Sequence, residues 1–262
     1  MGLLGQMDAL HAIAGFMVGV LVGVTGVGGG SLMTPLLVLL FGVSPHTAVG
    51  TDLLYASSTK VVGSGVHGWR ETIDWRILRR LATGSIPAAV LSVYVLSHFG
   101  KVGKETSHII LMVLGVMLIL TAVATLFQRK LAAYASSHQS VAQSHALLPT
   151  VLLGAILGVL VSISSVGAGA IGVTALLMLY PNLPVSRIVG TDIAHAVPLT
   201  LVAGMGHWMI GDVDPVLLLN LLIGSIPGVI LGSLFSTRAP DKYLRPALAA
   251  VLIISGTRLL MQ

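Results

Sequence analysis

Apolar residues fall into ten runs along the chain, separated by short polar or glycine-rich segments. Several runs reach the roughly 20 residues that an α-helix needs to cross the hydrocarbon core of a bilayer. Two of them, at about 31–43 and 168–181, are shorter, and each follows a glycine-rich break. The other eight runs lie at about 8–24, 46–66, 76–98, 107–127, 147–163, 184–207, 214–236 and 246–261. This pattern predicts an all-α polytopic membrane protein in which some helices are short and broken by glycine.

The composition excludes a water-soluble protein. Hydrophobic residues make up 55% of the 262 residues, charged residues make up 9%, and the mean hydropathy is +0.97. A soluble domain carries roughly 25% charged residues, so these few charges could not cover a surface in water. The lipid bilayer is therefore the expected surrounding, and a soluble enzyme, a nucleic-acid partner and a disordered chain are excluded. The lack of cysteine excludes disulfides and thiolate metal sites.

Short motifs recur in the two halves of the chain about 140 residues apart. Their order is also the same in both halves, which indicates an internal duplication. The repeated motifs are Gly50-Thr51-Asp52 with Gly190-Thr191-Asp192, and Gly84-Ser85-Ile86-Pro87 with Gly224-Ser225-Ile226-Pro227. We therefore predict a first transmembrane repeat over 1–127, a cytoplasmic linker over 128–146 and a second transmembrane repeat over 147–262.

Basic residues are distributed differently in the equivalent loops of the two halves. Cytoplasmic loops of membrane proteins accumulate Lys and Arg. Four arginines lie within 70–80, whereas the equivalent 207–220 stretch has no Lys or Arg and contains Asp212 and Asp214. We therefore predict two inverted-topology repeats of about five hydrophobic segments each, with both termini on the non-cytoplasmic side. A parallel duplication with accidental loop charges is the alternative.

Glycine-rich breaks precede both short runs, and these breaks are candidate substrate sites. Non-helical backbone at membrane depth is tolerated only where it is buried in protein or lines a cavity. The short helix that follows would direct free backbone N–H groups and a partial positive charge into the break, which suits a small anion. A glycine-rich helix crossing or an ordinary interfacial loop is the alternative. The predicted substrate-binding residues are Gly28, Gly29, Gly30 and Ser31 in the first half, and Gly167, Ala168, Gly169 and Ala170 in the second.

Two acidic residues lie inside apolar runs. Such residues are costly in a membrane, so they usually face the bundle interior and serve a function. Asp192 and His195 are three residues apart and share a helix face. We predict that Asp52, Asp192 and His195 couple transport to protons or another cation, and that Thr51 and Thr191 help to bind the substrate. The alternative is that each aspartate caps a helix or bonds a neighbouring helix.

Lys60 is the lysine that lies deepest in a long apolar run. Its charge could neutralise an anionic substrate, and it is included among the candidate binding residues. The run ends about two turns further on, so the side chain could equally extend along the helix to the cytoplasmic interface. This second interpretation is the one that the sequence favours.

The motifs together resemble the TauE/SafE sulfite exporter family. In the first half they are GVGGGSLMTPLLVLLFGVSPHTAVGTDLL and VHGWRETIDWRILRRLATGSIPAAVLSVYV, and in the second SVGAGAIGVTALLMLYPNLPVSRIVGTDI and GDVDPVLLLNLLIGSIPGVILGSLF. The resemblance covers nearly the whole chain apart from the linker. It implies a permease of the bacterial inner membrane that moves sulfite, sulfonates or related small anions, often as export. Many family members resemble GTS where this chain has Asp52 and Asp192, which points to a different coupling ion or substrate.

The expected function is therefore a secondary transporter of a small anionic substrate, driven by a coupling ion, in which one repeat rocks against the other. A transporter of a metal cation or another small solute, using the Asp and His residues, is the main alternative, and a membrane assembly protein is a weaker one. No nucleophile with a nearby base is found, so an enzyme is not expected. No metal-binding motif accompanies the histidines, so no cofactor is expected either. A homo-oligomer remains open.

Overall fold

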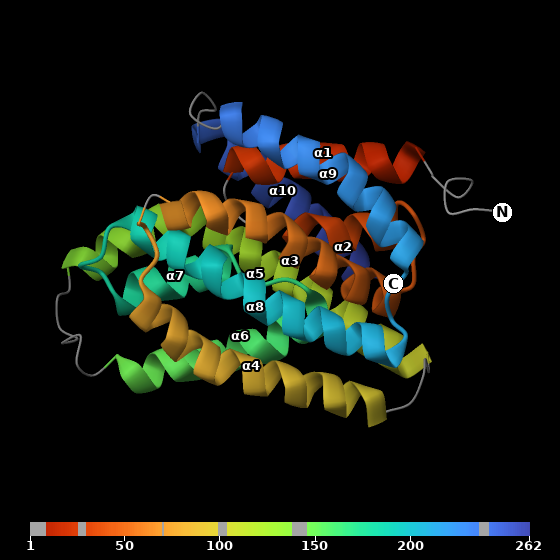
Figure 1. The fold of residues 1–262 in the computed structure, drawn as a ribbon, viewed down its shortest axis with the longest axis horizontal. Helices are drawn as coiled ribbons and strands as arrows, with labels where there is room; N and C mark the ends of the chain where they lie inside the picture. Colours follow the sequence, from red (N-terminus) through yellow and green to blue (C-terminus); the bar gives the residue numbers. More distant parts are fainter. Residues whose placement is uncertain (1–8, 26–29, 70, 99–103, 138–145, 236–240) are drawn as a thin grey trace.

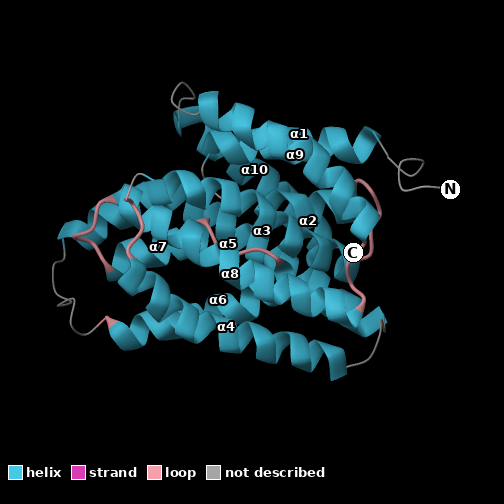
Figure 2. Cartoon of the chain, viewed as in Figure 1, coloured by secondary structure: helices cyan, strands magenta, loops and turns pink. Residues whose placement is uncertain are grey.

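The computed structural model describes residues 9–25, 30–69, 71–98, 104–137, 146–235 and 241–262. These residues form ten α-helices joined by loops, and no strand occurs among them (Figure 2). The predicted all-α class is thereby confirmed. The helices are α1 (Ala9–Thr25), α2 (Gly30–Leu39), α3 (Pro45–Trp69), α4 (Trp75–His98), α5 (Lys104–Ser137), α6 (Leu147–Ser164), α7 (Ala170–Leu179), α8 (Val185–Ile210), α9 (Pro215–Phe235) and α10 (Asp241–Leu260).

Among the described residues, five helices are long and apolar enough to cross a membrane: α4, α5, α6, α8 and α9. Large apolar side chains are exposed along their outer faces, for example Met209 with 84% of its surface exposed. Such side chains are stable against lipid and unfavourable in water. The protein is therefore an integral membrane protein.

The two short runs fold as short helices, as predicted. Helices α2 and α7 have 10 residues each, which corresponds to only about 15 Å of helix. Helix α6 ends at Ser164 and α7 begins at Ala170, so residues 165–169 form a non-helical break. Val166 and Ala168 in this break are buried. Protein atoms therefore surround the break, as a break within a membrane requires.

The closest helix pairs each combine one helix from each half of the chain. Helix α1 packs against α9, α4 packs against α6, α3 crosses α8, and α5 packs against α10. In Figure 1, α1 and α9 run together along the top of the molecule, and α4 and α6 run together along the bottom. The two halves are thus interleaved and do not form separate bodies.

Glycines bring the outer helix pairs into backbone contact. A Cβ atom at Gly84 of α4 would overlap the carbonyl oxygen of Val151 in α6, and a Cβ atom at Gly224 of α9 would overlap that of Ala12 in α1. Gly84 and Gly224 occupy the same place in the repeated motif. The two outer pairs therefore use the same close-packed contact, which is typical of small residues in membrane helices.

Gly84→Leu and Gly224→Leu are each expected to destabilise the folded protein. Overpacking of this kind costs about 1–3 kcal/mol, and here the obstacle is backbone, which cannot rotate away. The measurement is the melting temperature in detergent. Thr83→Leu is the matched control, because Thr83 precedes Gly84 in α4 and its side chain is exposed. Unchanged melting temperatures in both glycine variants would contradict the close packing.

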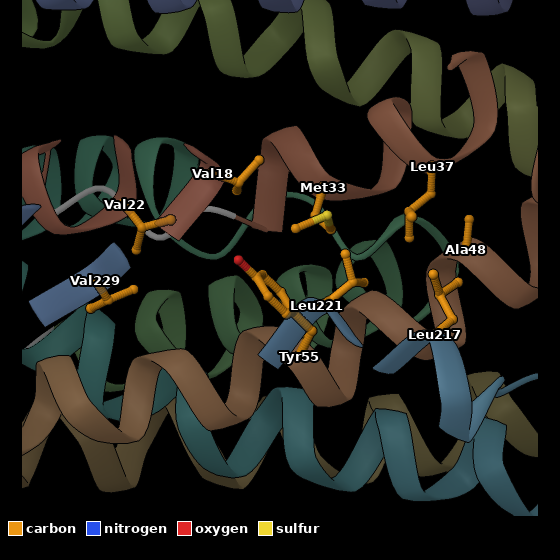
Figure 3. Packing of buried hydrophobic residues seen from close by; sticks show 9 residues of the cluster. All are labelled: Val18, Val22, Met33, Leu37, Ala48, Tyr55, Leu217, Leu221 and Val229. Atoms are coloured by element: carbon orange, nitrogen blue, oxygen red, sulfur yellow. The ribbon is translucent and has the colours of Figure 1, made fainter. Parts of the chain in front are cut away.

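A hydrophobic cluster joins α1, α2, α3 and α9. It consists of Val18, Val22, Met33, Leu37, Ala48, Tyr55, Leu217, Leu221 and Val229. Figure 3 shows the Tyr55 ring lying near Leu221, with its hydroxyl oxygen pointing away from Leu217 and Ala48. That hydroxyl is buried and has no hydrogen-bond partner among the described residues. The cluster holds α3 in place beside the polar residues described next.

Candidate transport site

The crossing of α3 and α8 places two buried carboxylates in the middle of the molecule. Asp52 lies on α3 and Asp192 on α8, and each has at most 1% of its surface exposed. Both residues therefore face the protein interior, as predicted for functional acids within a membrane. Neither residue caps its own helix, since Asp52 and Asp192 each lie about two turns inside it. Asp52 does bond a neighbouring helix, which is the other part of that alternative.

Asp52 is bound by the start of α2. The backbone N–H of Thr34 donates to Asp52 Oδ2 at 3.2 Å, and the Thr34 hydroxyl donates to the same oxygen. Asp52 Oδ1 has no hydrogen-bond partner among the described residues. The hydroxyl of Ser165, from the break before α7, faces Asp52 without reaching hydrogen-bond geometry. Asp52 thus bonds α2 and lies beside the break that precedes α7.

Asp192 lies against the start of α7. A Cβ atom at Gly172 would overlap Asp192 Oδ1, so the carboxylate lies directly against the α7 backbone at this glycine. The backbone N–H of Gly169 faces the carboxylate, but neither Asp192 oxygen has a hydrogen-bond partner among the described residues. The N-terminus of α7, which was expected to face a small anion, therefore faces a carboxylate of the protein itself.

The break itself depends on glycine. Gly167 and Gly169 have φ angles of 126° and 132°, in a region that L side chains rarely adopt. Ser165 ends α6 in the left-handed conformation with φ 57°. These conformations turn the chain sharply, so that α7 starts directly beside Asp192. The sequence identified this break correctly from its glycines.

Lys60 is buried within this cluster. Its exposed fraction is 5%, and Nζ lies 3.5 Å from the carbonyl oxygen of Ala168 in the break. The ammonium group is also within electrostatic reach of both Asp52 and Asp192. The sequence favoured a side chain that extends to the membrane interface, and this interpretation is wrong. Lys60 turns inward because the break offers it a carbonyl acceptor and the two carboxyl groups are within electrostatic reach.

His195 extends the cluster toward α4. His195 Nε2 and the Ser85 hydroxyl are 2.8 Å apart, and His195 Nδ1 has no partner among the described residues. The equivalent positions in the other half are Tyr55 and Ser225, whose hydroxyl groups face each other without a hydrogen bond. An imidazole is thus present at this position in one half only. Sequence reasoning missed Ser85, although it belongs to the repeated Gly-Ser-Ile-Pro motif.

Comparison with known proteins assigns the chain to a transporter family. The family model described as "Sulfite exporter TauE/SafE" matches residues 11–259. The chain belongs to the TauE/SafE family. Among its relatives, the "Probable membrane transporter protein YjnA" of Bacillus subtilis is 40% identical, over 97% of this chain and 100% of that protein. The "Probable membrane transporter protein MJ0441" of Methanocaldococcus jannaschii is 27% identical, over 96% of this chain and 95% of that protein. No solved structure matches the chain.

The TauE/SafE assignment and the apolar helices identify the protein as a membrane transporter. The family match covers nearly the whole chain, so both halves and their central cluster belong to the transporter fold. The family and its relatives are described as exporters and transporters, which agrees with the expectation that the chain is not an enzyme.

The two threonines of the repeated motif form hydrogen bonds with the backbone of loop residues. Thr51 Oγ1 accepts a hydrogen bond from the backbone N–H of Asp214 at 3.1 Å, and Thr191 Oγ1 accepts one from that of Asp74 at 2.8 Å. These two contacts are equivalent, and each joins one half of the chain to the other. They give no support to the prediction that Thr51 and Thr191 bind substrate.

The remaining predicted residues lie at the two helix starts. Gly28 and Gly29 lie outside the described residues, and Gly30 and Ser31 open α2. Gly167, Ala168 and Gly169 form the second break, and Ala170 opens α7. The structure therefore brings the second set of predicted residues together with Asp192 and Lys60.

A second polar cluster, which the sequence did not reveal, lies after α8. Asp212 Oδ2 is 3.5 Å from His207 Nδ1 and 3.8 Å from His46 Nδ1. Partial burial raises the pKa of Asp212, but the neighbouring imidazoles of His207 and His46 outweigh it and hold that pKa below its usual range. His207 Nε2 also contacts the carbonyl oxygen of Ser162 at 2.9 Å. This cluster ties α3, α6 and α8 together at one end.

Asp212→Asn is expected to lower the melting temperature at neutral pH. A carboxyl with a depressed folded-state pKa stabilises the fold above its unfolded pKa of about 3.9, and this contribution fades as the pH falls toward the folded value. The difference from the wild type should therefore shrink in acid. Asp214→Asn is the control, because Asp214 is exposed and asparagine caps a helix as well as aspartate does. An equal decrease in the melting temperature of Asp212→Asn at neutral and acidic pH would show that the ionised carboxylate does not stabilise the fold.

Proposed function

We propose that this protein is a secondary transporter that moves a small sulfur-containing anion, such as sulfite or an organosulfonate, across the bacterial inner membrane. Transport is coupled to protons or another cation and proceeds by alternating access, with export as the direction that the family description suggests. The observation that supports this proposal most strongly is the meeting of Lys60, Asp192 and the N-terminus of α7 inside the protein.

The coupling follows from competition at the start of α7. A helix N-terminus and a lysine ammonium group both stabilise a negative charge. In this structure Asp192 is the negative group nearest to the α7 N-terminus, and it interacts with Lys60. Protonation of Asp192 removes that charge, so a substrate anion can take its place beside Lys60 and the Gly169 N–H. Proton and anion then occupy the site together.

Asp52 and His195 extend this coupling to neighbouring helices. Asp52 accepts two hydrogen bonds from Thr34, so a change in the charge of Asp52 changes the strength of the contact between α3 and α2. His195 contacts Ser85, so its protonation alters the contact between α8 and α4. Each group therefore links a proton at the site to the position of another helix, which is what alternating access requires.

The moving units are proposed to combine helices from both halves. The sequence suggested that one repeat rocks against the other, but α1 packs on α9 and α4 packs on α6 through glycine contacts. Motion of one whole repeat would separate these pairs. We therefore assign the motion to the two outer pairs, α1 with α9 and α4 with α6, against the inner helices that carry Asp52, Lys60 and Asp192.

A cation substrate is the second candidate, because the cluster contains two buried acidic side chains and only one lysine. No group of three or more His, Cys, Asp or Glu side chains that could hold a metal ion occurs in the described part of the chain. Ligand-induced stabilisation separates the two candidates, because a ligand that binds the folded state raises its melting temperature.

The test compares sulfite, thiosulfate, small sulfonates, carboxylates and divalent metals on the detergent-purified protein at two pH values. We expect sulfite or a sulfonate to raise the melting temperature, more strongly at the lower pH, where Asp192 binds a proton more readily. Stabilisation by divalent metals alone would overturn the anion assignment in favour of the cation candidate.

A further inference from the structure

We infer that the protein carries a second anion-binding site, for a phosphate or related oxyanion group, in a basic pocket where α4 and α8 begin. The pocket has a volume of about 490 Å³. It is lined by Asp74, Arg76, Ile77, Arg79, Arg80, Tyr180, Leu183 and Arg187. These residues come from two segments that are about 100 residues apart in the chain. This site is separate from the Lys60 cluster and goes beyond the proposed transport function.

The positive charge of the pocket is not neutralised by protein carboxylates. Four arginines line it, and no ion pair joins any of them to a carboxylate within the described ranges. The one acidic residue, Asp74, uses Oδ1 to accept the backbone N–H groups of Arg76 at 3.0 Å and Ile77 at 3.2 Å. Asp74 therefore caps α4. Arg79 Nε donates to the carbonyl oxygen of Trp75 and Arg80 Nη1 to the Tyr180 hydroxyl, and the other guanidinium N–H groups are left for a ligand.

Two helix N-termini add to this positive charge. Helix α4 begins at Trp75 and α8 begins at Val185, so Arg76 and Arg187 lie in the first turns of their helices. Cations at a helix N-terminus oppose the helix dipole and are unfavourable there. An anion with several acceptor oxygens reverses this effect, because it interacts favourably with the dipoles and the guanidinium groups alike.

The other half of the chain shows that the fold does not require these arginines. Asp214 caps α9 as Asp74 caps α4, with its Oδ1 accepting the N–H groups of Val216 at 2.9 Å and Leu217 at 3.0 Å. The helix start is therefore the same in both halves. The positions equivalent to Arg76, Arg79, Arg80 and Arg187 are Val216, Leu219, Asn220 and Thr47. The arginines thus line one pocket at one end of the molecule and are not part of the shared helix-capping contact.

The surroundings fit a phosphate group at the membrane surface. Tyr180 is buried, its hydroxyl lies 2.7 Å from that of Thr150, and Arg80 Nη1 donates to it at 3.4 Å. Trp75 beside the pocket is 61% exposed, as is typical of tryptophan at the level of lipid headgroups. Basic pockets between membrane helices bind anionic headgroups. A lipid headgroup and a free phosphate ion share this chemistry, so both are tested.

The experiment measures binding of two probes to the full chain and to Arg76→Gln/Arg187→Gln. One probe is phosphatidylglycerol in nanodiscs that otherwise contain phosphatidylcholine, and the other is inorganic phosphate added to phosphatidylcholine nanodiscs. The control is Arg258→Gln, which removes an arginine near the end of α10 outside this pocket. Arg187→Gln alone is the milder variant, should the double variant lose its native helix content or melting transition.

We expect the wild type and Arg258→Gln to bind at least one probe with equal affinity, and the double variant to bind it roughly 100-fold more weakly. Each lost charged hydrogen bond accounts for about tenfold. Arg187→Gln alone should lose about tenfold. If the wild type binds phosphatidylglycerol but not inorganic phosphate, the pocket is a lipid site. If the wild type also binds inorganic phosphate, the pocket is a site for soluble anions. Equal binding of both probes by the wild type and the pocket variants, or binding of neither probe, would overturn the inference. Neither outcome bears on sulfur-anion transport.

Discussion

Asp192→Asn is expected to abolish proton coupling while preserving or strengthening anion binding. Asparagine has the shape of a protonated aspartate but cannot release a proton. Because the Asp192 carboxylate lies at the start of α7 and interacts with Lys60, its neutral replacement leaves both groups available to the substrate. A small sulfonate, which unlike sulfite does not itself gain or lose a proton near neutral pH, should therefore stabilise the variant equally at both pH values, and its flux in proteoliposomes should lose its pH dependence.

Asp214→Asn is the matched control for this prediction. Asp214 follows α8 and is exposed, so its replacement removes a charge without touching the central cluster. We expect its flux and its pH profile to equal those of the wild type. An Asp192→Asn protein that binds sulfite more weakly than the wild type, or that keeps the full pH dependence of transport, would show that the carboxylate does not compete with the anion.

Lys60→Met is expected to lower sulfite flux roughly 10- to 100-fold. A hydrogen bond to a charged group contributes about 1.5–3 kcal/mol, and each 1.4 kcal/mol corresponds to a factor of ten. Lys60 is also the lysine that interacts with both buried carboxylates, so its loss leaves buried charge uncompensated and should destabilise the fold. Flux and melting temperature are measured on the same preparation.

Two further variants separate transport from stability. In Lys60→Met/Asp192→Asn one buried negative charge is removed together with the lysine, so the melting temperature should recover while sulfite flux stays low. Lys130→Met removes an exposed lysine of α5 and should change neither quantity. Recovery of flux together with stability in the double variant would mean that Lys60 supports the fold and does not bind the anion.

The sequence predicted the parts of the site that depend on local chain properties. Glycine clusters in apolar sequence indicate a broken helix, and the structure has such a break at 165–169, followed by α7. Acids inside apolar runs are rarely exposed to lipid, and both Asp52 and Asp192 are buried. These conclusions need only the cost of unpaired backbone and of charge in a membrane.

The residues that contact Asp52, Lys60 and His195 could not be predicted, because those contacting residues come from other segments of the chain. The direction of the Lys60 side chain depends on the carbonyl oxygen of Ala168, which is 108 residues away in the chain. Thr34 and Ser85 contribute ordinary hydroxyl groups, and no local pattern distinguishes them from hydroxyls that bond their own helix. The interleaving of α1 with α9 likewise depends on glycine contacts between distant segments.

The central claim is that one substrate anion and one proton share the site formed by Lys60, Asp192 and the start of α7. The most direct test reconstitutes the wild type and Asp192→Asn in proteoliposomes that contain a pH-sensitive dye, and follows proton movement during transport of a small sulfonate, which carries no proton of its own. We expect protons to accompany the sulfonate in the wild type, and the sulfonate to move without them in Asp192→Asn. Equal proton movement in both proteins would contradict the account.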